Sequence, residues 1–241
     1  MKHTSLLFVC LFAGTAASHA TLVFADDFSG YADGTALTGH APVVGSGTWG
    51  GTDAWKVNGG AVSLVDGGGG SVIGYFASPL AAGQKLTLTF DTQAITGFLG
   101  SSWAVVSLLD SLDGGHERCA IGDPGGDNTT WGMRIIGDFD TTDSNQANTA
   151  TFSYVYNTGA WTFSTNGGGY SGAVTPGYAL DHLRIASGGY YDHPIAGNMK
   201  LSDISVSIDS DTITSVPEPG SLLALGGLLG SGMFLRFRRR G

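Results

Sequence analysis

Glycine is the residue that most constrains what this chain can fold into. The 241 residues include 40 glycines, which gather in clusters such as 67–70 and 167–169 with no three-residue period. Glycine is costly inside helices because it loses more conformational freedom on folding than any other residue, so a helical bundle is excluded. A collagen-like fibre is excluded because it needs glycine at every third position. The 42% hydrophobic and 13% charged content excludes a disordered chain.

Short stretches of alternating apolar and polar residues lie between the glycine clusters. In Lys85–Phe90, Leu86, Leu88 and Phe90 alternate with a lysine and two threonines, which predicts a half-buried strand. Similar stretches run over 61–65, 71–76, 103–109, 131–136, 149–156, 161–165, 182–186 and 201–208. Asn58-Gly59 and Asn166-Gly167 are candidates for hairpin turns.

These strands, without a sustained helical period or an internal repeat, predict an all-β body. We expect one domain over residues 21–215, folded as a two-sheet antiparallel β-sandwich, or jelly roll. A signal helix within 1–20 and a short C-terminal helix would flank it.

The first 20 residues have the parts of a secretory signal peptide. Lys2 precedes the apolar run 6–13, and Ser18-His19-Ala20 has small residues at the two positions that a signal peptidase reads. We expect cleavage after Ala20, because cleavage after Ala25 would destroy the strand-like segment 21–24. The alternative, a buried first helix, is disfavoured because the run is short and lacks amphipathic periodicity.

The last 26 residues, 216–241, have three ordered parts. A proline-rich segment comes first, an uncharged apolar stretch over 221–235 follows, and a basic tail ends the chain. The residues of the first and last parts are Val216, Pro217, Glu218, Pro219 and Gly220, and Arg236, Arg238, Arg239 and Arg240. The two prolines predict an extended hinge ahead of a helix, since each lacks an amide donor and fixes its own φ.

The apolar stretch is a marginal transmembrane helix. At about 1.5 Å per residue, residues 221–235 reach about 22 Å, and they span about 30 Å of hydrocarbon only with Gly220 and snorkelling arginines. The arginines would stay on the cytoplasmic side, which places the body of the chain outside the cytoplasm. This orientation agrees with the signal peptide.

The C-terminal end resembles the PEP-CTERM sorting signal of Gram-negative bacteria that make exopolysaccharide. Pro217, Glu218 and Pro219 carry the resemblance, supported by residues 222–235 and the arginine tail. The resemblance implies processing at the motif by an exosortase, a membrane cysteine protease-like enzyme, during export through the inner membrane. The protein would then reach the cell surface or extracellular matrix. An ordinary single-pass anchor with a proline-rich stalk is the alternative.

The body between the two signals is strongly acidic. Setting aside Lys2, Glu218 and the four C-terminal arginines leaves 19 of the 20 acidic and 6 of the 11 basic side chains, a net charge of −13. Nucleic acid is not expected as a partner, because binding needs lysine and arginine to neutralise phosphates. An acidic polysaccharide would be repelled unless divalent cations bridged it to the protein.

Cys119 is the only cysteine of the body, so no internal disulfide can form. Its strand-like surroundings predict a small buried side chain rather than a nucleophile.

The order of landmarks in the body resembles the concanavalin A-like, LamG-type jelly rolls. The features that match are 24–28 with Gly30-Tyr31, Trp103, Trp131-Gly132, 161–167, and the closing pair 180–185 and 201–204. The resemblance implies a fold but not a ligand, because this fold hosts lectins, glycosidases, lyases and structural modules.

No arrangement of residues indicates catalysis. Laminarinase-like members of this fold carry a Glu-x-Asp-x-x-Glu strand, which is missing, and Glu117 is the only glutamate of the body. The polar cluster of Asp110, Asp113, His116 and Glu117 is expected to be a solvated loop rather than an acid/base or metal site. The pairs Asp181-His182 and Asp192-His193 are not expected to form triads, because neighbours on a strand point to opposite faces. No serine lies in a nucleophile-elbow context. We therefore expect no catalytic residues.

Two kinds of ligand remain open. Oxygen-rich loops over 123–128 and 138–145 could hold a structural calcium ion, or be plain solvated turns; no other cofactor is expected. Sugars could stack on aromatic residues in or near loops, unless these residues close the sandwich as core. They are Trp49, Trp55, Tyr170, Tyr178, Tyr190 and Tyr191. Tyr190 and Tyr191, beside Gly188-Gly189, are the preferred candidates for ligand contact.

The sequence thus favours an exported, exosortase-processed cell-surface or exopolysaccharide-matrix protein with a non-catalytic jelly-roll domain. The first alternative is a carbohydrate-binding module for exopolysaccharide or other glycans. The second is a polysaccharide-degrading enzyme, which would need two carboxyl groups converging in a cleft.

Overall fold

The computed structural model describes residues 19–65, 69–93, 102–123, 131–135, 138–143, 149–165, 168–189 and 200–211. Within these ranges the chain consists of β-strands and one short 3-10 helix, η1 (Ser111–Asp113). The strands are β1 (Thr21–Asp26), β2 (Ser46–Gly51), β3 (Trp55–Val57), β4 (Val62–Leu64), β5 (Gly70–Tyr75), β6 (Gln84–Gln93), β7 (Ser102–Asp110), β8 (His116–Asp123), β9 (Trp131–Ile135), β10 (Asp138–Asp143), β11 (Thr149–Val155), β12 (Ala160–Thr165), β13 (Gly168–Ala173), β14 (His182–Gly189) and β15 (Lys200–Ser210).

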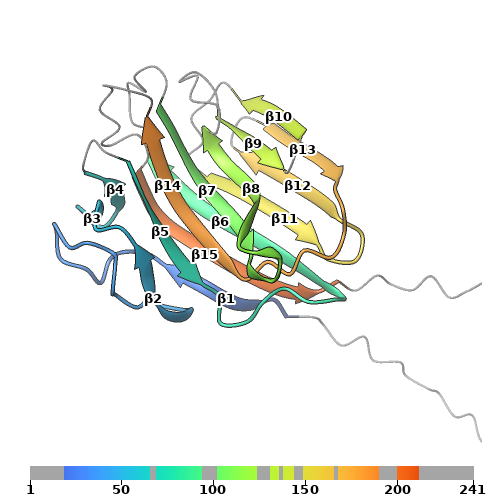
Figure 1. The fold of residues 1–241 in the computed structure, drawn as a ribbon, viewed down its shortest axis with the longest axis horizontal. Helices are drawn as coiled ribbons and strands as arrows, with labels where there is room; N and C mark the ends of the chain where they lie inside the picture. Colours follow the sequence, from blue (N-terminus) through green and yellow to red (C-terminus); the bar gives the residue numbers. More distant parts are fainter. Residues whose placement is uncertain are drawn as a thin grey trace, which may run out of the picture.

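The strands form two antiparallel sheets that pack face to face (Figure 1). The back sheet has the order β13-β12-β11-β6-β15-β4-β3, with β1 paired to β15. The front sheet has the order β10-β9-β8-β7-β14-β5-β2. The expected all-β, two-sheet sandwich with a jelly-roll-like strand order is therefore confirmed. Its central pairs, β6 with β15 and β7 with β14, join segments that lie far apart in the sequence.

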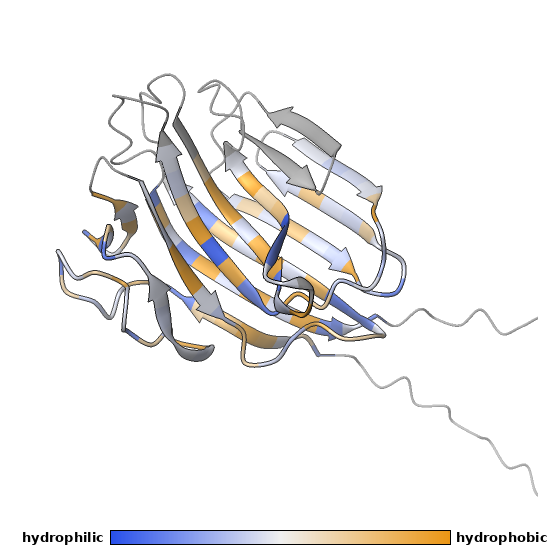
Figure 2. Cartoon of the chain, in the orientation of Figure 1, coloured by the Kyte–Doolittle hydropathy of each residue, from blue (hydrophilic) through white to orange (hydrophobic). Residues whose placement is uncertain are grey.

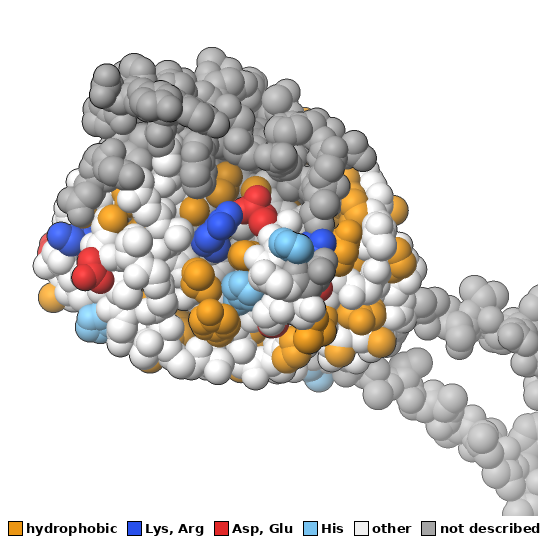
Figure 3. All heavy atoms as spheres, viewed as in Figure 1, with side chains coloured by type: hydrophobic (Ala, Val, Ile, Leu, Met, Phe, Trp, Pro, Cys, Tyr) orange, Lys and Arg blue, Asp and Glu red, His pale blue; other side chains and the backbone are white. Residues whose placement is uncertain are grey.

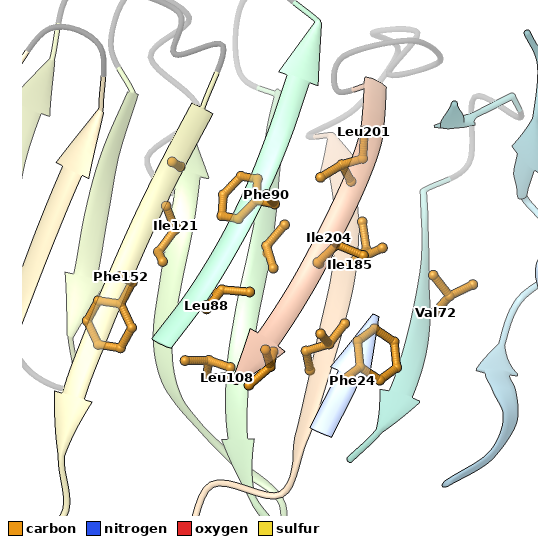
Figure 4. Packing of buried hydrophobic residues seen from close by; sticks show 14 of the residues in the cluster. Phe24, Val72, Leu88, Phe90, Leu108, Ile121, Phe152, Ile185, Leu201 and Ile204 are labelled. Atoms are coloured by element: carbon orange, nitrogen blue, oxygen red, sulfur yellow. The ribbon is translucent and has the colours of Figure 1, made fainter. Parts of the chain in front are cut away.

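The core lies between the sheets and follows the period-two alternation of the strands. Leu86, Leu88 and Phe90 of β6 are at most 1% exposed, as the sequence predicts. Figure 4 shows Leu88 and Phe90 lying close to buried side chains of the neighbouring strands, and Figure 2 shows hydrophobic and hydrophilic bands alternating along the strands. Cys119 belongs to the same cluster at 3% exposed, which confirms the predicted burial of its side chain. Burial raises the pKa of its thiol well above the ordinary value.

A buried carboxylate ties β1 to the segment that follows it. Asp26 is 1% exposed; its Oδ1 accepts a hydrogen bond from Phe28 N at 3.0 Å, and its Oδ2 accepts bonds from Tyr31 Oη and Trp49 Nε1, both at 2.8 Å. Burial raises the pKa of Asp26. Burial, together with the bond to Asp26, also raises the pKa of Tyr31. Residues 24–31, singled out in the sequence, therefore have a structural role, and we call the hydrogen-bonded group of Asp26, Phe28, Tyr31 and Trp49 the Asp26 cluster.

The Asp26 cluster also explains two local features. Phe28 has a φ of 55°, a conformation that is uncommon outside glycine, and the bond from its N–H to Asp26 closes the turn there. The indole of Trp49 packs edge-on against Phe24, with ring centroids 5.2 Å apart. A Cβ at Gly74 would come within 2.5 Å of the Phe24 ring, so β5 needs glycine opposite this pair.

Several strands lack the alternation that predicts the others. The sequence does not predict β2, β3, β10 or β13, because these strands are short, glycine-rich or acidic. The expected hairpin at Asn58-Gly59 is confirmed, since Asn58 N donates to Ala61 O at 2.8 Å between β3 and β4. Thr165 pairs with Gly168, so the strands on either side of Asn166-Gly167 also form a hairpin.

The two terminal signals lie largely outside the described residues. The signal helix and the whole of 216–241 are among the residues not described, so the sorting motif and basic tail stay sequence-based predictions. Strand β1 begins at Thr21, directly after the predicted cleavage site at Ala20. No helix in the described ranges is long and apolar enough to cross a membrane.

We predict that Asp26→Asn destabilises the fold. The carboxylate accepts from three donors, and an asparagine amide would turn a donor of its own towards one of them. An unmatched buried donor costs about 1–3 kcal/mol, so the free energy of unfolding in urea should fall by about that amount. Asp27→Asn is the control, because the Asp27 carboxylate is exposed and accepts from the neighbouring Ser29. Equal losses of unfolding free energy in the two variants would contradict a stabilising role for the Asp26 cluster.

Candidate functional site

The front sheet carries a polar cluster on the face that points away from the core. Along β7, Ala104, Val106 and Leu108 face the core, while Ser107 and Leu109 face outward. Figure 3 shows acidic, basic and histidine side chains gathered near the middle of this face, beside hydrophobic ones. We call Tyr75, Ser107, Glu117, His182 and Arg184 the outer-face cluster.

A β-bulge places Glu117 on this face. Cys119 of β8 pairs with Leu108, but Glu117 pairs with Leu109, so Arg118 is the extra residue. Strict alternation from the buried Cys119 would have turned Glu117 towards the core. Because a bulge re-aims the side chains beside it, Glu117 instead points outward. The expectation of a solvated loop is wrong here, since His116 and Glu117 belong to β8.

Glu117 is held by two donors from the neighbouring strands. Ser107 Oγ donates to Glu117 Oε2 at 2.6 Å, and Arg184 Nη2 pairs with the same oxygen. Arg184 lies opposite Ser107 in the pairing of β14 with β7, so the ion pair spans β7. Arg184 Nε is buried and has no hydrogen-bond partner among the described residues. The cluster thus combines a neutralised charge pair with an unused donor.

An exposed aromatic ring lies one row away on the same face. Tyr75 is 45% exposed, and it pairs across the strands with His182, which is 5% exposed. The two rings lie 5.3 Å apart at an interplanar angle of 31°. His182 pairs on its other side with Leu109, which in turn pairs with Glu117. Tyr75 is thus an exposed ring at the border of the polar cluster. The exposure of Tyr75 could have been predicted from the sequence, because the alternation in 71–76 turns its side chain outward.

His182 and Asp181 do meet, contrary to expectation. His182 Nδ1 lies 2.5 Å from Asp181 Oδ1, because Asp181 precedes β14 and is not bound by strand alternation. Ser111 Oγ donates to Asp181 Oδ2. A hydrolase triad needs the serine hydroxyl on the histidine, whereas here both serine and histidine contact the aspartate. This order orients His182 and does not activate Ser111.

Other aromatic candidates are part of the core or its border. Trp49 and Trp55 are at most 1% exposed, so of the two alternatives for these residues, a sugar platform or the core, the core holds. Trp55 Nε1 donates to Gly70 O at 3.0 Å, which satisfies its polar atom. Tyr170 stacks on Phe163, and Tyr178 stacks on Tyr154. Tyr190 and Tyr191 lie outside the described residues.

The described residues contain no group of three His, Cys, Asp or Glu side chains that could hold a metal ion. The side chains of the two predicted calcium loops, 123–128 and 138–145, are not among those described. On the outer face of the back sheet, Asp91 pairs directly with Asp203. Burial, then the charge of Asp91, raises the pKa of Asp203.

The comparisons with known proteins give likenesses in fold. No family model matches the chain, and no curated protein matches it. Among solved structures, the CBM2 module of the evolved Dit protein of Lactobacillus casei BL23 phage J-1 is 13% identical, with a TM-score of 0.48 over 81% of this chain and 98% of that one. A Bauhinia forficata lectin in complex with GalNAc is 10% identical, with a TM-score of 0.49 over 81% and 100%.

An immunostimulatory antigen and pseudo beta-1,3-glucanase of Mycobacterium tuberculosis is 15% identical, with a TM-score of 0.45 over 77% of this chain and 98% of that one. None of these likenesses assigns a role to a residue of this chain.

We predict that Asp203→Asn raises stability at neutral pH by a few tenths of a kcal/mol, because like charges directly opposite each other destabilise a strand pair. A raised native pKa means that the folded state binds the proton more tightly than the unfolded state. The destabilisation caused by ionised Asp203 is therefore absent at a pH below 3.8, the ordinary pKa that applies in the unfolded chain. It grows as pH rises from there through the raised pKa of the folded state. Melting temperatures at pH 7 and at about pH 3 test this.

Asp209→Asn is the control for this prediction, because Asp209 faces Lys85 at 3.6 Å and not another carboxylate. It should not raise the melting temperature at pH 7. A gain in Asp203→Asn that persists at acid pH would contradict charge repulsion as its cause.

Proposed function

We propose that this protein is exported, processed by an exosortase at Pro217-Glu218-Pro219, and displayed at the cell surface or in the matrix, where its β-sandwich binds a neutral glycan through the outer-face cluster. The observation that carries the binding proposal is the exposed ring of Tyr75 beside the Glu117–Arg184 pair. The order of the terminal signals supports export and processing.

The exposed ring suits the apolar face of a sugar. Tyr75 leaves 45% of its surface open while its ring packs against the buried His182. A ring held from behind in this way loses little freedom when a ligand stacks on its other side. A pyranose would cover the ring and bring its hydroxyl groups over the neighbouring strand β14, which carries Arg184. Because strands lie about 4.8 Å apart, a second sugar unit would be needed to reach Glu117 of β8.

The polar side chains suit hydroxyl groups and disfavour charged ones. Glu117 has acceptor capacity beyond the bonds from Ser107 and Arg184, and Arg184 has further N–H donors. Because Glu117 neutralises Arg184, the pair offers no net positive charge to an acidic glycan. The body as a whole carries −13 between the terminal signals, which repels such glycans further. We therefore infer a neutral glycan.

The cluster supports binding rather than hydrolysis. A glycosidase needs one carboxylic acid to protonate the leaving group and a second carboxylate across the sugar. Glu117 is the only glutamate between the two signals, and its Oε2 is occupied by Ser107 and Arg184. Asp181 is engaged by Ser111 and His182. We propose a non-catalytic domain on these grounds.

We predict that Tyr75→Ala weakens glycan binding about tenfold, the equivalent of about 1.4 kcal/mol, because the stacking surface is lost. Binding would be screened on a glycan array and measured by calorimetry with the neutral glycan that is retained. Tyr75→Phe should bind like the wild type if the ring face makes the contact. Val43→Ala, which trims a 70% exposed side chain elsewhere, is the control. No retention on any neutral glycan, or equal binding by Tyr75→Ala, would overturn the proposal.

The sorting step is tested in the native host. Replacing Pro217, Glu218 and Pro219 by alanine should leave the protein at full length in the inner membrane. The intact mass of the purified protein reads out both this change and the predicted cleavage after Ala20. Unchanged processing of the triple variant would refute an exosortase signal while leaving the glycan proposal standing.

A further inference from the structure

The two sheets end in five edge strands among the described residues, and four of them are protected against pairing. Strand β1, which pairs with β15 on one side, is covered on the other by bonds such as Ala25 N to Val44 O at 2.9 Å and Ala77 N to Val23 O at 2.8 Å. The backbone of 34–37 covers β3, through bonds such as Gly34 N to Val57 O at 2.8 Å and Leu37 N to Trp55 O at 3.0 Å. On β2, Gly39 N donates to Trp49 O, and Trp49 N donates to His40 O, both at 2.8 Å. Strand β10 carries three aspartates in six residues. Covers and charges of these kinds are how β-proteins avoid pairing at edges.

The fifth edge, β13, has none of these protections among the described residues. Its sequence, Gly-Gly-Tyr-Ser-Gly-Ala, has neither charge nor proline, and Gly168, Gly169 and 171–173 are exposed. It pairs with β12 over its whole length without a bulge. In Figure 1 it forms one border of the back sheet. An open, regular edge of this kind is a template for another strand.

The phase of the ladder shows which backbone groups are open. Val174 N donates to Gly159 O at 3.0 Å, just beyond the end of β13. Bonded and non-bonded pairs alternate in an antiparallel ladder, so the N–H and C=O groups of every second residue point towards β12. Counting back from Val174, those of Gly169, Ser171 and Ala173 point away from it.

The charge distribution indicates what pairs there. Between Asp143 and Asp181 the sequence contains no Asp, Glu, Lys, Arg or His, and this stretch includes β11, β12 and β13. The rest of the exported body is strongly acidic. A second copy would therefore meet like charge over most of the surface, whereas β13 and the two strands behind it carry none, and the aspartates at this end belong to β10 of the front sheet. A charged foreign strand would find no countercharge on it.

We propose that β13 pairs with β13 of a second copy, antiparallel and about a two-fold axis at Ser171. The backbone groups of Gly169, Ser171 and Ala173 would bond to those of Ala173, Ser171 and Gly169 in the second copy, which joins the two back sheets into one. The arrangement is isologous and closes at two copies. Small side chains at these three positions leave room for the approach. The outer-face cluster lies on the other sheet, so the proposal does not depend on glycan binding.

A proline at position 171 should prevent pairing between two copies without disturbing the fold of either copy. Because Ser171 N–H points away from β12, Ser171→Pro removes no bond of the protein's own sheet, and edge strands tolerate proline at such positions. Ser171→Val is the matched control, since it keeps the N–H and a strand-forming side chain. Circular dichroism and melting temperature should show both variants folded.

The measurement is sedimentation velocity over a range of concentrations, on protein purified as its host processes it. We expect a dimer for the wild type and Ser171→Val, and a dissociation constant at least about tenfold higher for Ser171→Pro. In Ser171→Cys, oxidation should link two copies, because Cys119 is buried and does not compete. A monomeric wild type, undiminished dimerisation of a folded Ser171→Pro, or open-ended assembly would overturn the proposal.

Discussion

The burial of apolar side chains between the central strands of the two sheets is the interaction on which the rest of the structure depends. One sheet contributes β6 and β15 to this contact and the other contributes β7 and β14. Their buried residues are Leu86, Leu88, Phe90, Ile204, Val206, Ala104, Val106, Leu108, Leu183 and Ile185. Paired residues lie 73 to 87 positions apart in β7 and β14, and 107 to 126 apart in β6 and β15, so the chain must close long loops before this burial stabilises it. Residues 21–215 contain one cysteine, Cys119, so no disulfide within them shortens those loops.

The same alternation that fills the core determines both outer faces. On the back sheet, every second residue of the central strands is a small hydroxyl or a charge, and one row across five strands is Ser207, Thr87, Ser153, Thr162 and Ser171. On the front sheet the outward row instead contains Arg184, Ser107 and the buried Ala120. One outer face is therefore evenly polar, whereas the other combines polar groups with apolar surface. This asymmetry is why we propose ligand binding at the front sheet rather than at the back sheet.

The sequence predicts the strands that follow regular alternation of apolar and polar residues. It does not predict side-chain positions where a β-bulge or a long-range hydrogen bond overrides that alternation. Lys85–Phe90 and Leu201–Ile208 were predictable because one face of each is apolar. Glu117 was not, because the bulge at Arg118 cannot be read from residue types. For Trp49, residue types left two alternatives open, a sugar-binding platform or a core position. It is a core residue, and Asp26, 23 residues away, satisfies the buried N–H of its indole.

The excess of negative charge has a structural consequence beyond solubility. Like charges on an acidic body act at a range of about 10 Å in moderate salt, so they oppose contact between two copies wherever aspartates face outward. An uncharged stretch that ends in an uncovered strand is then the one described region where this repulsion is weakest. Backbone pairing is not specific by itself, since any extended chain can supply N–H and C=O groups. In the proposed dimer, charge elsewhere on the body would supply selectivity, because the back-sheet strands β11, β12 and β13 that meet carry no charge. The aspartates of β10, at the same end of the front sheet, would limit the strength of that pairing at low salt.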